Sequence, residues 1–453
     1  MSEQNRRHAI VIGASMGGLL ATRVLADHFD EVTLVERDTL PPEGEHRRGV
    51  PQGRHTHGLL ASGGLVLERF FPGIQRELID AGAVKGDLSG NSRWFLEGGC
   101  LQKFSSGLDG LLMSRPFLEG KVRRHVMRLP NVRTREASVA EGLATSEDRQ
   151  HVTGIKMAGE IVGADLVVDA TGRGSHSPQW LEAMGYVKPP EERVEIAMGY
   201  TTRLFRRSSM DLNGDAIVIM PPSPETMRAA AMLAQEGNRW TVTLASYFGN
   251  YAPTELEGFI EFARNLPVPY IYEVIRRAEP VGEPTTARFP ASLRRRYESL
   301  TRFPDGFLVV GDAISSFNPV YGQGMSVAAL EAVELAETLA EGPSDLAPRF
   351  FRRAAKIVDI PWSIVVGGDL RIPGTTGPRS AAVNFINWYM AKLHKAAHHD
   401  AVAALAFHKV GNLLAPPPSV MHPRIAMRVL WGNLKPRSKT PPPPESMSVT
   451  AGG

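Results

Sequence analysis

The stretch that decides the fold is RHAIVIGASMGG, residues 7–18. Arg7 to Ile12 is largely apolar and β-branched and predicts a short buried strand, which ends at Gly13. A helical pattern follows over Leu19–Phe29, and a second strand is predicted over Glu31–Val35. A strand, a glycine-rich turn, a helix and a second strand predict the first unit of a nucleotide-binding α/β domain.

Individual residues of this unit match a dinucleotide-binding fingerprint. Gly13 permits the tight turn out of the strand, and Gly18 lets the helix pack closely on it. Glu36 follows Gly13 by 23 residues (36 − 13), close to the spacing of about 20 at which an acidic residue binds ribose hydroxyls. The start of the helix offers N–H groups to a pyrophosphate. Ser15 stands where the fingerprint has its middle glycine, which weakens the match.

The same residues allow a second interpretation. Gly13-Ala14-Ser15-Met16-Gly17 fits the G-x-S-x-G pattern of the nucleophile elbow in serine hydrolases, which also lies between a strand and a helix. Several strands normally precede the elbow in that fold, whereas only one precedes it here, and Glu36 would have no role. We therefore favour the dinucleotide-binding interpretation.

Composition limits the classes of protein to which the chain can belong. Its 453 residues suggest two or three domains, at about 150 residues per domain. Lys and Arg number 51 against 48 for Asp and Glu, so nucleic acid is not the expected partner. The single cysteine, Cys100, excludes a disulfide within the chain. No run reaches the about 18 apolar residues of a membrane-spanning helix, and we interpret the N-terminus as cytosolic rather than as a secretion signal. We therefore expect a cytoplasmic protein without membrane contact.

Two later segments repeat the layout of a strand that runs into a glycine-containing turn. The strand predicted over Asp165–Val168 continues into DATGRGS, residues 169–175, and Phe307–Val310 continues into Gly311-Asp312-Ala313. The latter leads through residues 318–325 into a helix predicted over 326–339. A buried aspartate at a strand end can accept hydrogen bonds from polyol hydroxyls, and a glycine-rich helix start attracts negative charge. With the N-terminal unit, these segments indicate a long cofactor held at its pyrophosphate and again near its ring.

Alternating apolar segments over residues 199–205, 216–220 and 240–247 predict an antiparallel sheet inserted into the nucleotide domain. Its aromatic residues are candidates for a substrate cavity, with the ordinary core as the alternative for each: Tyr200, Phe205, Trp240, Tyr247 and Phe248. Amphipathic helices predicted over 384–393 and 401–414 form a C-terminal helical region that we expect to cap a substrate tunnel.

Two groups of histidines raise the question of a metal site. His55 and His57 lie two residues apart in a polar loop but have no third ligand at suitable local spacing. His394, His398 and His399 include an i,i+4 pair but lack the glutamate of a metal-binding motif. We predict a polar loop that lines a site in the first case, a solvated helix face in the second, and no metal.

Three segments, taken together and in this order, resemble the group A flavoprotein monooxygenases, the class typified by p-hydroxybenzoate hydroxylase. They are residues 13–18 with Glu36, residues 165–175, and residues 311–312 with 319–325. Further stretches look like the actinobacterial polyene epoxidases of polyether antibiotic biosynthesis: VIGASM (11–16), VERD (35–38), PQGRH (51–55), DATGRGS (169–175) and FNPVYG (317–322). The resemblance runs from about residue 8 to residue 430 and is more specific for the fold and for FAD than for the substrate.

The resemblance implies an α/β fold, in which a FAD-binding Rossmann-like domain of the glutathione reductase type carries an inserted antiparallel β-sheet substrate domain and a C-terminal helical region. The FAD-binding domain would comprise residues 1–85, 114–190 and 286–345, and the substrate domain residues 86–113 and 191–285. The helical region would cover residues 346–434. Residues 435–453, with four consecutive prolines, are predicted to form a disordered tail.

Carried over to matching positions, the resemblance also assigns contacts to the cofactor. The FAD pyrophosphate would lie against Gly13, Ser15 and Gly18, and the adenosine against Glu36, Arg37 and the backbone of Val139. Arg54 and Arg115 would lie along the FAD, Asp312 would bind its ribityl chain, and Gly322, Gly324 and Met325 would lie beside the isoalloxazine ring. No catalytic side chain is implied, because the flavin carries the chemistry.

The implied activity is the FAD-dependent transfer of one O₂-derived oxygen from a flavin C4a-hydroperoxide to an apolar substrate, such as a polyene, polyketide or terpenoid, by epoxidation or hydroxylation. The family's Asp-Gly motif is replaced by Asp169-Ala170-Thr171-Gly172, which leaves open whether NAD(P)H binds transiently as electron donor or a partner flavin reductase supplies the electrons. A double-bond reductase of the geranylgeranyl reductase type and a non-enzymatic FAD-binding scaffold are the alternatives. The Trp-x-Trp-x-Ile-Pro motif of flavin halogenases is missing.

Overall fold

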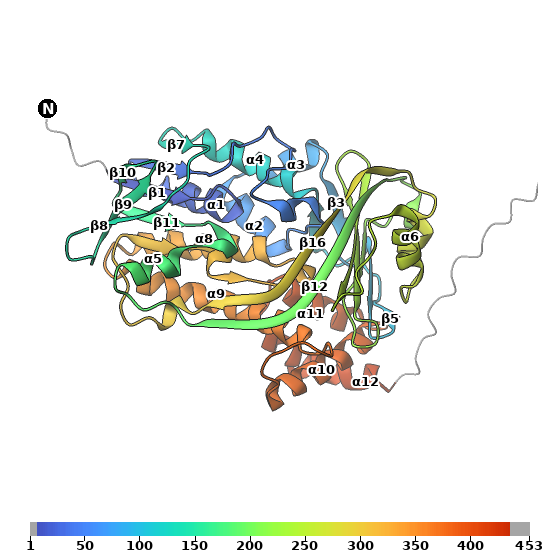
Figure 1. Cartoon of the computed structure of the whole chain (residues 1–453). Helices are drawn as coiled ribbons and strands as arrows, with labels where there is room; N and C mark the ends of the chain where they lie inside the picture. The colour runs from blue at the N-terminus through green and yellow to red at the C-terminus, as the bar shows by residue number, and fades with distance from the viewer. Residues whose placement is uncertain (1–6, 435–453) are drawn as a thin grey trace, which may run out of the picture.

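A five-stranded parallel sheet forms the centre of one half of the molecule (Figure 1), in the strand order β17-β11-β1-β2-β7. The computed structural model describes residues 7–434, so the tail predicted over 435–453 lies outside the described residues. The strands are β1 (His8–Ile12), β2 (Glu31–Val35), β7 (Val132–Arg135), β11 (Leu166–Asp169) and β17 (Phe307–Val309). Because β1 pairs with both β2 and β11, segments far apart in the sequence meet at the carboxyl end of this sheet.

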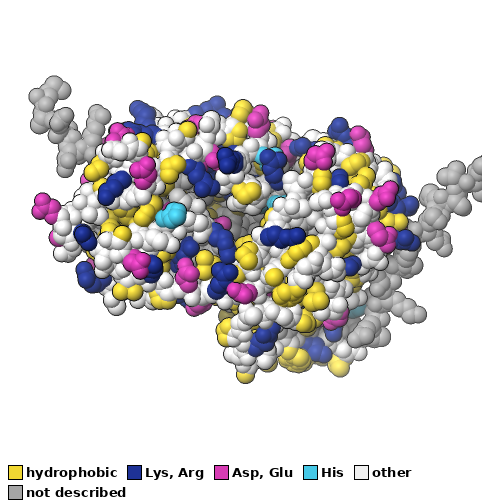
Figure 2. Space-filling view, in the orientation of Figure 1, with side chains coloured by type: hydrophobic (Ala, Val, Ile, Leu, Met, Phe, Trp, Pro, Cys, Tyr) yellow, Lys and Arg dark blue, Asp and Glu magenta, His cyan; other side chains and the backbone are white. Residues whose placement is uncertain are grey.

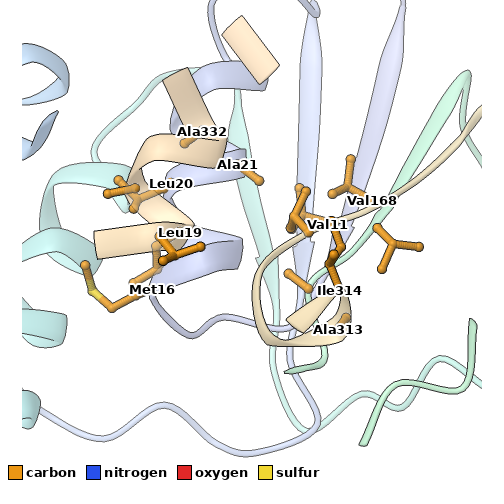
Figure 3. Close-up of a cluster of buried hydrophobic side chains, with 14 of the residues drawn as sticks. Val11, Met16, Leu19, Leu20, Ala21, Val168, Ala313, Ile314 and Ala332 are labelled. Atoms are coloured by element: carbon orange, nitrogen blue, oxygen red, sulfur yellow. The ribbon is translucent and has the colours of Figure 1, made fainter. Parts of the chain in front are cut away.

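Two helices pack against each other beside the parallel sheet, α1 (Met16–Leu25) and α8 (Gly324–Ala340). Figure 3 shows side chains from both helices and from the sheet in this contact. Leu19 and Leu20 of α1 and Val168 of β11 are completely buried. Burial of one such side chain contributes about 1.5–3 kcal/mol, so the contact holds the starts of the two helices in place.

Shorter elements surround this sheet. They are α2 (Ala61–Phe70), α3 (Ile74–Asp80), α4 (Arg115–Met127), α5 (Ser177–Ala183), and an antiparallel sheet of β8 (Gly142–Thr145), β9 (Val152–Met157) and β10 (Glu160–Gly163). α4 begins at Arg115, because the Ser114 hydroxyl caps it by accepting a hydrogen bond from the N–H of Phe117.

An eight-stranded sheet forms the other half, in the order β18-β16-β12-β15-β14-β13-β4-β5. Neighbouring strands are antiparallel except β13 and β4, which confirms the predicted inserted sheet. The strands are β4 (Ser92–Leu96), β5 (Gly99–Cys100), β12 (Glu191–Arg206), β13 (Ile217–Met220), β14 (Arg228–Gln235), β15 (Arg239–Tyr247), β16 (Pro280–Arg295) and β18 (Ser315–Ser316). β3 (Val84–Asp87) and β6 (Asp109–Leu112) form a separate pair.

The two longest strands connect the two halves. β12 and β16 each have 16 residues, and they pair along most of their length. Figure 1 shows both strands running from the parallel-sheet half into the antiparallel half. The domain boundary predicted between residues 285 and 286 therefore falls inside β16, a single continuous strand.

Two helices that we did not predict, α6 (Leu256–Arg264) and α7 (Tyr270–Ile275), pack on the antiparallel sheet. Beneath them, Phe205 and Trp240 are completely buried, and the indole N–H of Trp240 donates a hydrogen bond of 2.8 Å to Asp211. The expectation that Phe205 and Trp240 line a substrate cavity is therefore wrong, because both belong to the core between the sheet and these helices.

The C-terminal region is helical, as predicted. It contains α9 (Leu346–Asp369), α10 (Ala381–Ala397), α11 (Ala401–Gly411) and α12 (Pro423–Gly432), and the last three enclose a core of their own around Leu393. None of the helices over residues 7–434 combines the length and the apolar character needed to cross a bilayer. Figure 2 shows charged side chains of both signs scattered over one face of the molecule, in keeping with the small net charge.

Replacing Trp240 by Phe tests its assignment to the core. The variant leaves the buried Asp211 carboxylate without the indole N–H, so we expect it to lower the free energy of unfolding by about 1–3 kcal/mol. Urea denaturation measures the loss. Trp388, with 55% of its surface exposed, provides the control, since Trp388→Phe should change stability by no more than about 0.5 kcal/mol. Equal effects of the two substitutions would contradict the assignment.

Candidate functional site

A cavity of about 1620 Å³ runs from the β1–α1 turn to the C-terminal helices. It passes the segment between β17 and α8, and its walls include strands of the antiparallel sheet. A pocket for one small ligand usually has a volume of about 300–1,000 Å³. This cavity therefore has room for more than one molecule.

The β1–α1 turn brings the start of α1 to one end of the cavity. Gly13 has a φ of +101°, a conformation that favours glycine. Gly18 packs against the same turn, where an added Cβ would lie 1.7 Å from the Gly13 carbonyl oxygen. Ser15, Met16 and Gly17 line the cavity, so the N–H groups of the first helical turn lie at its wall. This arrangement can hold an anionic group.

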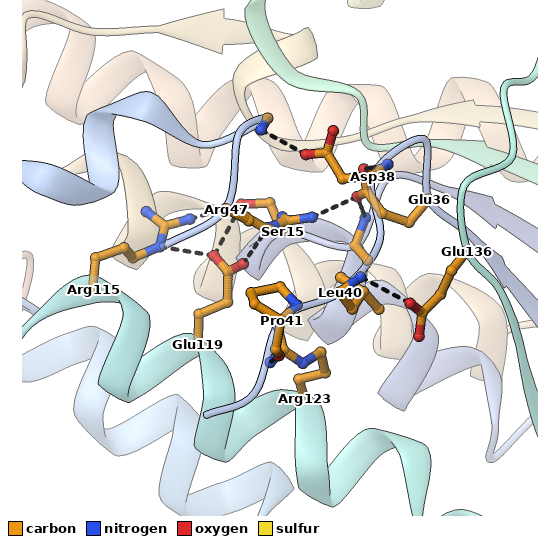
Figure 4. A network of polar contacts seen from close by, with 12 residues as sticks. Ser15, Glu36, Asp38, Leu40, Pro41, Arg47, Arg115, Glu119, Arg123 and Glu136 are labelled. Atoms are coloured by element: carbon orange, nitrogen blue, oxygen red, sulfur yellow. Dashed lines mark hydrogen bonds and ion pairs between the residues drawn. The ribbon is translucent and has the colours of Figure 1, made fainter. Parts of the chain in front are cut away.

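A buried network of charged side chains fixes this turn (Figure 4). Glu36 accepts hydrogen bonds from the N–H of Ala14 at 2.8 Å and from the Arg47 guanidinium at 2.7 Å. Arg47 also donates to Glu119 at 2.9 Å. Glu119 accepts a further bond of 3.0 Å from Arg115, whose guanidinium reaches the Ser15 hydroxyl at 2.7 Å. The network joins the β1–α1 turn to α4 and to the loop after β2.

Sequence reasoning missed two members of this network, Arg47 and Glu119. Glu119 could have been found from its position four residues after Arg115 on a helix, a spacing that brings opposite charges together. Arg47 lies in a charged loop, where no periodic pattern indicates burial. Burial alone would raise the pKa of Glu36, but the Arg47 guanidinium and the N–H groups of Ala14 and Asp38 outweigh it and hold that pKa below its usual value.

Asp312 follows β17 and faces the cavity near the start of α8. Its side chain is exposed to the cavity and accepts no hydrogen bond from the described residues, whereas we predicted a buried aspartate. Desolvation by the surrounding protein atoms disfavours the charged form and raises the pKa of this carboxyl group. The nearby positive charges of Arg115 and Arg173 oppose the shift. A Cβ added at Gly324, the first residue of α8, would lie 3.6 Å from its Oδ1. Asp312 is thus available to bind hydroxyl groups.

Asp169, at the end of β11, is fully occupied by its own turn. The carboxylate is completely buried and accepts hydrogen bonds from the N–H and hydroxyl of Thr171 at 2.8 and 2.6 Å. The hydroxyl groups of Ser175 and Ser177 also donate to it. Asp169 therefore stabilises the turn after β11 and has little capacity left for a ligand.

Most of the predicted cofactor residues lie on the wall of this one cavity. They are Gly13, Ser15, Glu36, Arg37, Arg115, Val139, Asp312, Gly322, Gly324 and Met325. Gly18 lies behind the wall, where it lets α1 approach β1. Arg54 is exposed and does not line the cavity, so the expectation that its side chain lies along the cofactor is not met. The individual contacts of the other residues with a cofactor stay predictions.

Of the five candidate substrate residues, Tyr200 lies on the cavity wall. Phe205 and Trp240 belong to the second core described above. Tyr247 and Phe248 also do not line the cavity, because the Tyr247 hydroxyl donates to the buried Asp369 and the Phe248 ring packs over Gly374. Alternation along a strand therefore identified the sheet but not which of its faces borders the cavity.

The two groups of histidines considered as metal ligands lie in different parts of the structure. His55 and His57 line the cavity, and His55 Nδ1 lies 2.8 Å from the Thr202 hydroxyl oxygen. Burial lowers the pKa of His55 to about 4. His394 is buried and also lines the cavity, so the prediction of a solvated helix face is wrong for this residue. Within residues 7–434, no three His, Cys, Asp or Glu side chains come together as metal ligands.

Comparisons with known proteins agree with this architecture. The chain is 34% identical over 383 residues to Protein Rv3254 of Mycobacterium tuberculosis, and the match covers 80% of each chain. The chain belongs to the same family as Protein Rv3254. No family model matches it.

Solved structures show which known fold this member of the Rv3254 family shares. A flavoprotein/dehydrogenase from Cytophaga hutchinsonii, 14% identical, aligns with a TM-score of 0.68 over 94% of this chain and 98% of its own. PqsL from Pseudomonas aeruginosa, which is described as a probable FAD-dependent monooxygenase, is 17% identical and aligns with a TM-score of 0.62 over 80% and 95% of the two chains. The predicted α/β fold with an inserted antiparallel sheet is therefore confirmed.

The close approach of α1 to β1 predicts a strong difference between two adjacent glycines. Gly18→Ala places a Cβ against the Gly13 carbonyl oxygen, and we expect it to cost at least about 1–3 kcal/mol of stability. Gly17→Ala places a Cβ 3.8 Å from Ala328 Cβ and 4.0 Å from Gly311 Cα, which are ordinary contact distances, and should be tolerated. Thermal unfolding of the two variants measures the difference, and a Gly18→Ala variant as stable as Gly17→Ala would refute the packing described.

Removing Arg47 should destabilise the protein in a pH-dependent manner. Arg47→Met leaves two buried carboxylates without this partner, and we expect a loss of about 3–5 kcal/mol at pH 7. The folded-state pKa of Glu36 lies below its unfolded value, so its contribution is present above the unfolded pKa of about 4.3 and is lost as the pH falls through the folded pKa. The difference from the wild type should therefore shrink as the pH falls below about 4.3.

Chemical denaturation at pH 7 and pH 3 measures this effect. Arg76→Met, which removes an exposed pair with Asp80, is the matched control and should leave the unfolding midpoint unchanged at both pH values. A constant difference between Arg47→Met and the wild type at the two pH values would contradict the role given to Glu36.

Proposed function

We propose that this chain is a cytoplasmic FAD-dependent monooxygenase that inserts one O₂-derived oxygen into an apolar natural-product intermediate, by epoxidation or hydroxylation. One observation carries the proposal. A single cavity joins the β1–α1 turn to Asp312 and the start of α8, although the two lie about 300 residues apart in the sequence. The fold shared with the flavoproteins named above supports the same cofactor.

The groups that face the cavity fit the successive parts of FAD. The first turn of α1 suits the pyrophosphate, and the Asp312 carboxylate, without a partner among the described residues, suits the ribityl hydroxyls. Arg115 lies between these places and adds positive charge. Gly322 and Gly324 leave room for the isoalloxazine ring, and the α8 dipole would stabilise its negative charge on reduction.

Bound flavin would supply the redox chemistry and the activation of O₂. The chain would position the substrate and exclude water from the reacting atoms. The wall that continues beyond Gly322 suits this role, because it contains Tyr200 of β12 and apolar side chains of β13 and β14, among them Ile219 and Leu233. We therefore place the substrate along these strands.

The turn after β11 bears on how the flavin would be reduced. The Asp169 carboxylate is saturated by the turn itself, so this carboxylate offers no contact to a nicotinamide cofactor. We propose that NAD(P)H binds transiently or that a partner flavin reductase supplies reducing equivalents. A close relationship to polyene epoxidases, and with it a polyene, polyketide or terpenoid substrate, belongs to the same proposal.

Replacing Asp312 by Ala tests the cofactor assignment. The variant removes the carboxylate that faces the cavity, so we expect it to be purified with little or no FAD. Asp312→Asn keeps one acceptor oxygen and should retain an intermediate amount. The ratio of visible flavin absorbance to protein measures the content, with circular dichroism to show folding. Asp305→Ala, at an exposed site, is the control. A fully yellow Asp312→Ala variant would refute the assignment.

The reaction itself is tested with the holoenzyme, NADPH, O₂ and a panel of polyenes, terpenoids and aromatic compounds. Mass spectrometry should find a product that has gained one oxygen atom. Reduction of a substrate double bond without O₂ uptake would instead identify a double-bond reductase. Bound FAD that neither NADPH nor an added flavin reductase reduces would identify a scaffold protein.

A further inference from the structure

Four aromatic rings gather at the end of the cavity formed by the C-terminal helices. Trp94 comes from β4, His394 from α10, and Phe407 and His408 from α11, and all four line the cavity. The centroid of the Phe407 ring lies 6.0 Å from that of Trp94, 4.8 Å from that of His394 and 5.4 Å from that of His408. In Figure 1, α10 and α11 lie below the antiparallel sheet, away from β1 and β2.

The nitrogen atoms of these rings are buried without partners. Both ring nitrogens of His394, Nε2 of His408 and Nε1 of Trp94 form no hydrogen bond with any of the described residues. The two histidines are only 6% and 1% exposed. Native proteins leave few buried polar atoms unsatisfied, so four such atoms around one cavity end favour the binding of a hydrogen-bonding group there. His8 differs, because both of its ring nitrogens have partners within 2.9 Å.

These rings carry no charge at neutral pH. Burial lowers the pKa of His394 to about 3, with a further contribution from the Arg371 charge, and lowers the pKa of His408 to about 4. A neutral imidazole offers one donor and one acceptor, and an indole offers one donor. Arg371 and Lys395 also line the cavity, but Arg371 forms an ion pair with Glu97, and the Glu225 carboxylate lies close enough to both cations to feel their charges. The cluster therefore suits an uncharged group with a hydrogen-bonding oxygen rather than an anion.

We propose that Trp94, His394 and His408 form a subsite that binds an uncharged hydroxyl or carbonyl group at one end of an otherwise apolar substrate. The subsite is continuous with the apolar wall of β13 and β14 and with the segment that contains Gly322. The inference rests on the proposed function in one respect, namely that the opposite end of the substrate would lie beside the flavin and react there. It changes the expected substrate from a purely apolar molecule to an amphipathic one.

Binding of simple probes tests the subsite without turnover. Decanol and undecane have nearly the same length and differ in the hydroxyl group, and displacement of the fluorescent dye Nile red measures their dissociation constants. In the wild type, decanol should bind more tightly than undecane. In the double variant His394→Phe/His408→Phe, which keeps the rings, the ratio of the two constants should fall about tenfold, the equivalent of about 1.4 kcal/mol.

His398→Phe is the control, at the residue that follows the end of α10. His398 Nε2 is 2.9 Å from the Leu96 carbonyl oxygen, and the residue does not line the cavity, so this variant should keep the preference for decanol. It should also lower the melting temperature of the protein, since the hydrogen bond is lost. The double variant should keep or raise the melting temperature, because it removes polar atoms that lack partners.

Three results would overturn the proposal. They are an unchanged decanol preference in the double variant, a preference of the wild type for decanoate over decanol, and a large fall in the melting temperature of His394→Phe and His408→Phe. The FAD content of every variant is recorded in parallel. A protein that lacks FAD but prefers decanol would contradict the proposed function and leave the subsite standing, which separates the two failures.

Discussion

The contact between α1 and β1 is the constraint on which the rest of the site depends. The helix lies so close to the strand that position 18 has no room for a side chain. Because of this close approach, the start of α1 lies at the cavity and contacts α8, since a Cβ atom at position 17 would be 3.8 Å from the Cβ of Ala328. The buried charges of Glu36, Arg47 and Glu119 then hold the turn from the other side. Three distant parts of the chain thus form one binding surface.

Local patterns in the sequence sufficed for four of the five strands of the parallel sheet, whereas β7, which is only partly buried, was not predicted. The strand over Glu31–Val35 was predicted to the residue. These elements are determined by neighbours in the sequence and by nearly continuous burial, which a linear pattern records. The positions of Gly13 and Asp312 on one cavity followed from the layout of strand and turn, because parallel strands present their carboxyl ends at the same edge.

Other features could not be predicted because they depend on what packs against a given face. Phe205 and Trp240 alternate correctly for a sheet, but alternation does not say that α6 covers one face and the cavity borders the other. His394 shows the same limit on a helix, because its spacing is compatible with solvent, a metal or a cavity. Arg47 lies in a loop without periodicity, and only the long-range contact with Glu36 explains its burial.

The pairing of β12 with β16 along most of their length, with two shifts of register, has a mechanical meaning. Both strands extend from one half of the molecule into the other, so no flexible loop of these strands lies at the junction. We therefore expect the two halves to move little relative to each other. Any opening that admits a bulky molecule then has to arise in the C-terminal helices, which are connected to α9 by residues 370–380, a segment with two glycines at positive φ. Movement of the C-terminal helices would then limit the rate of product release. Substitutions in these helices would change the turnover rate without changing any contact with the cofactor.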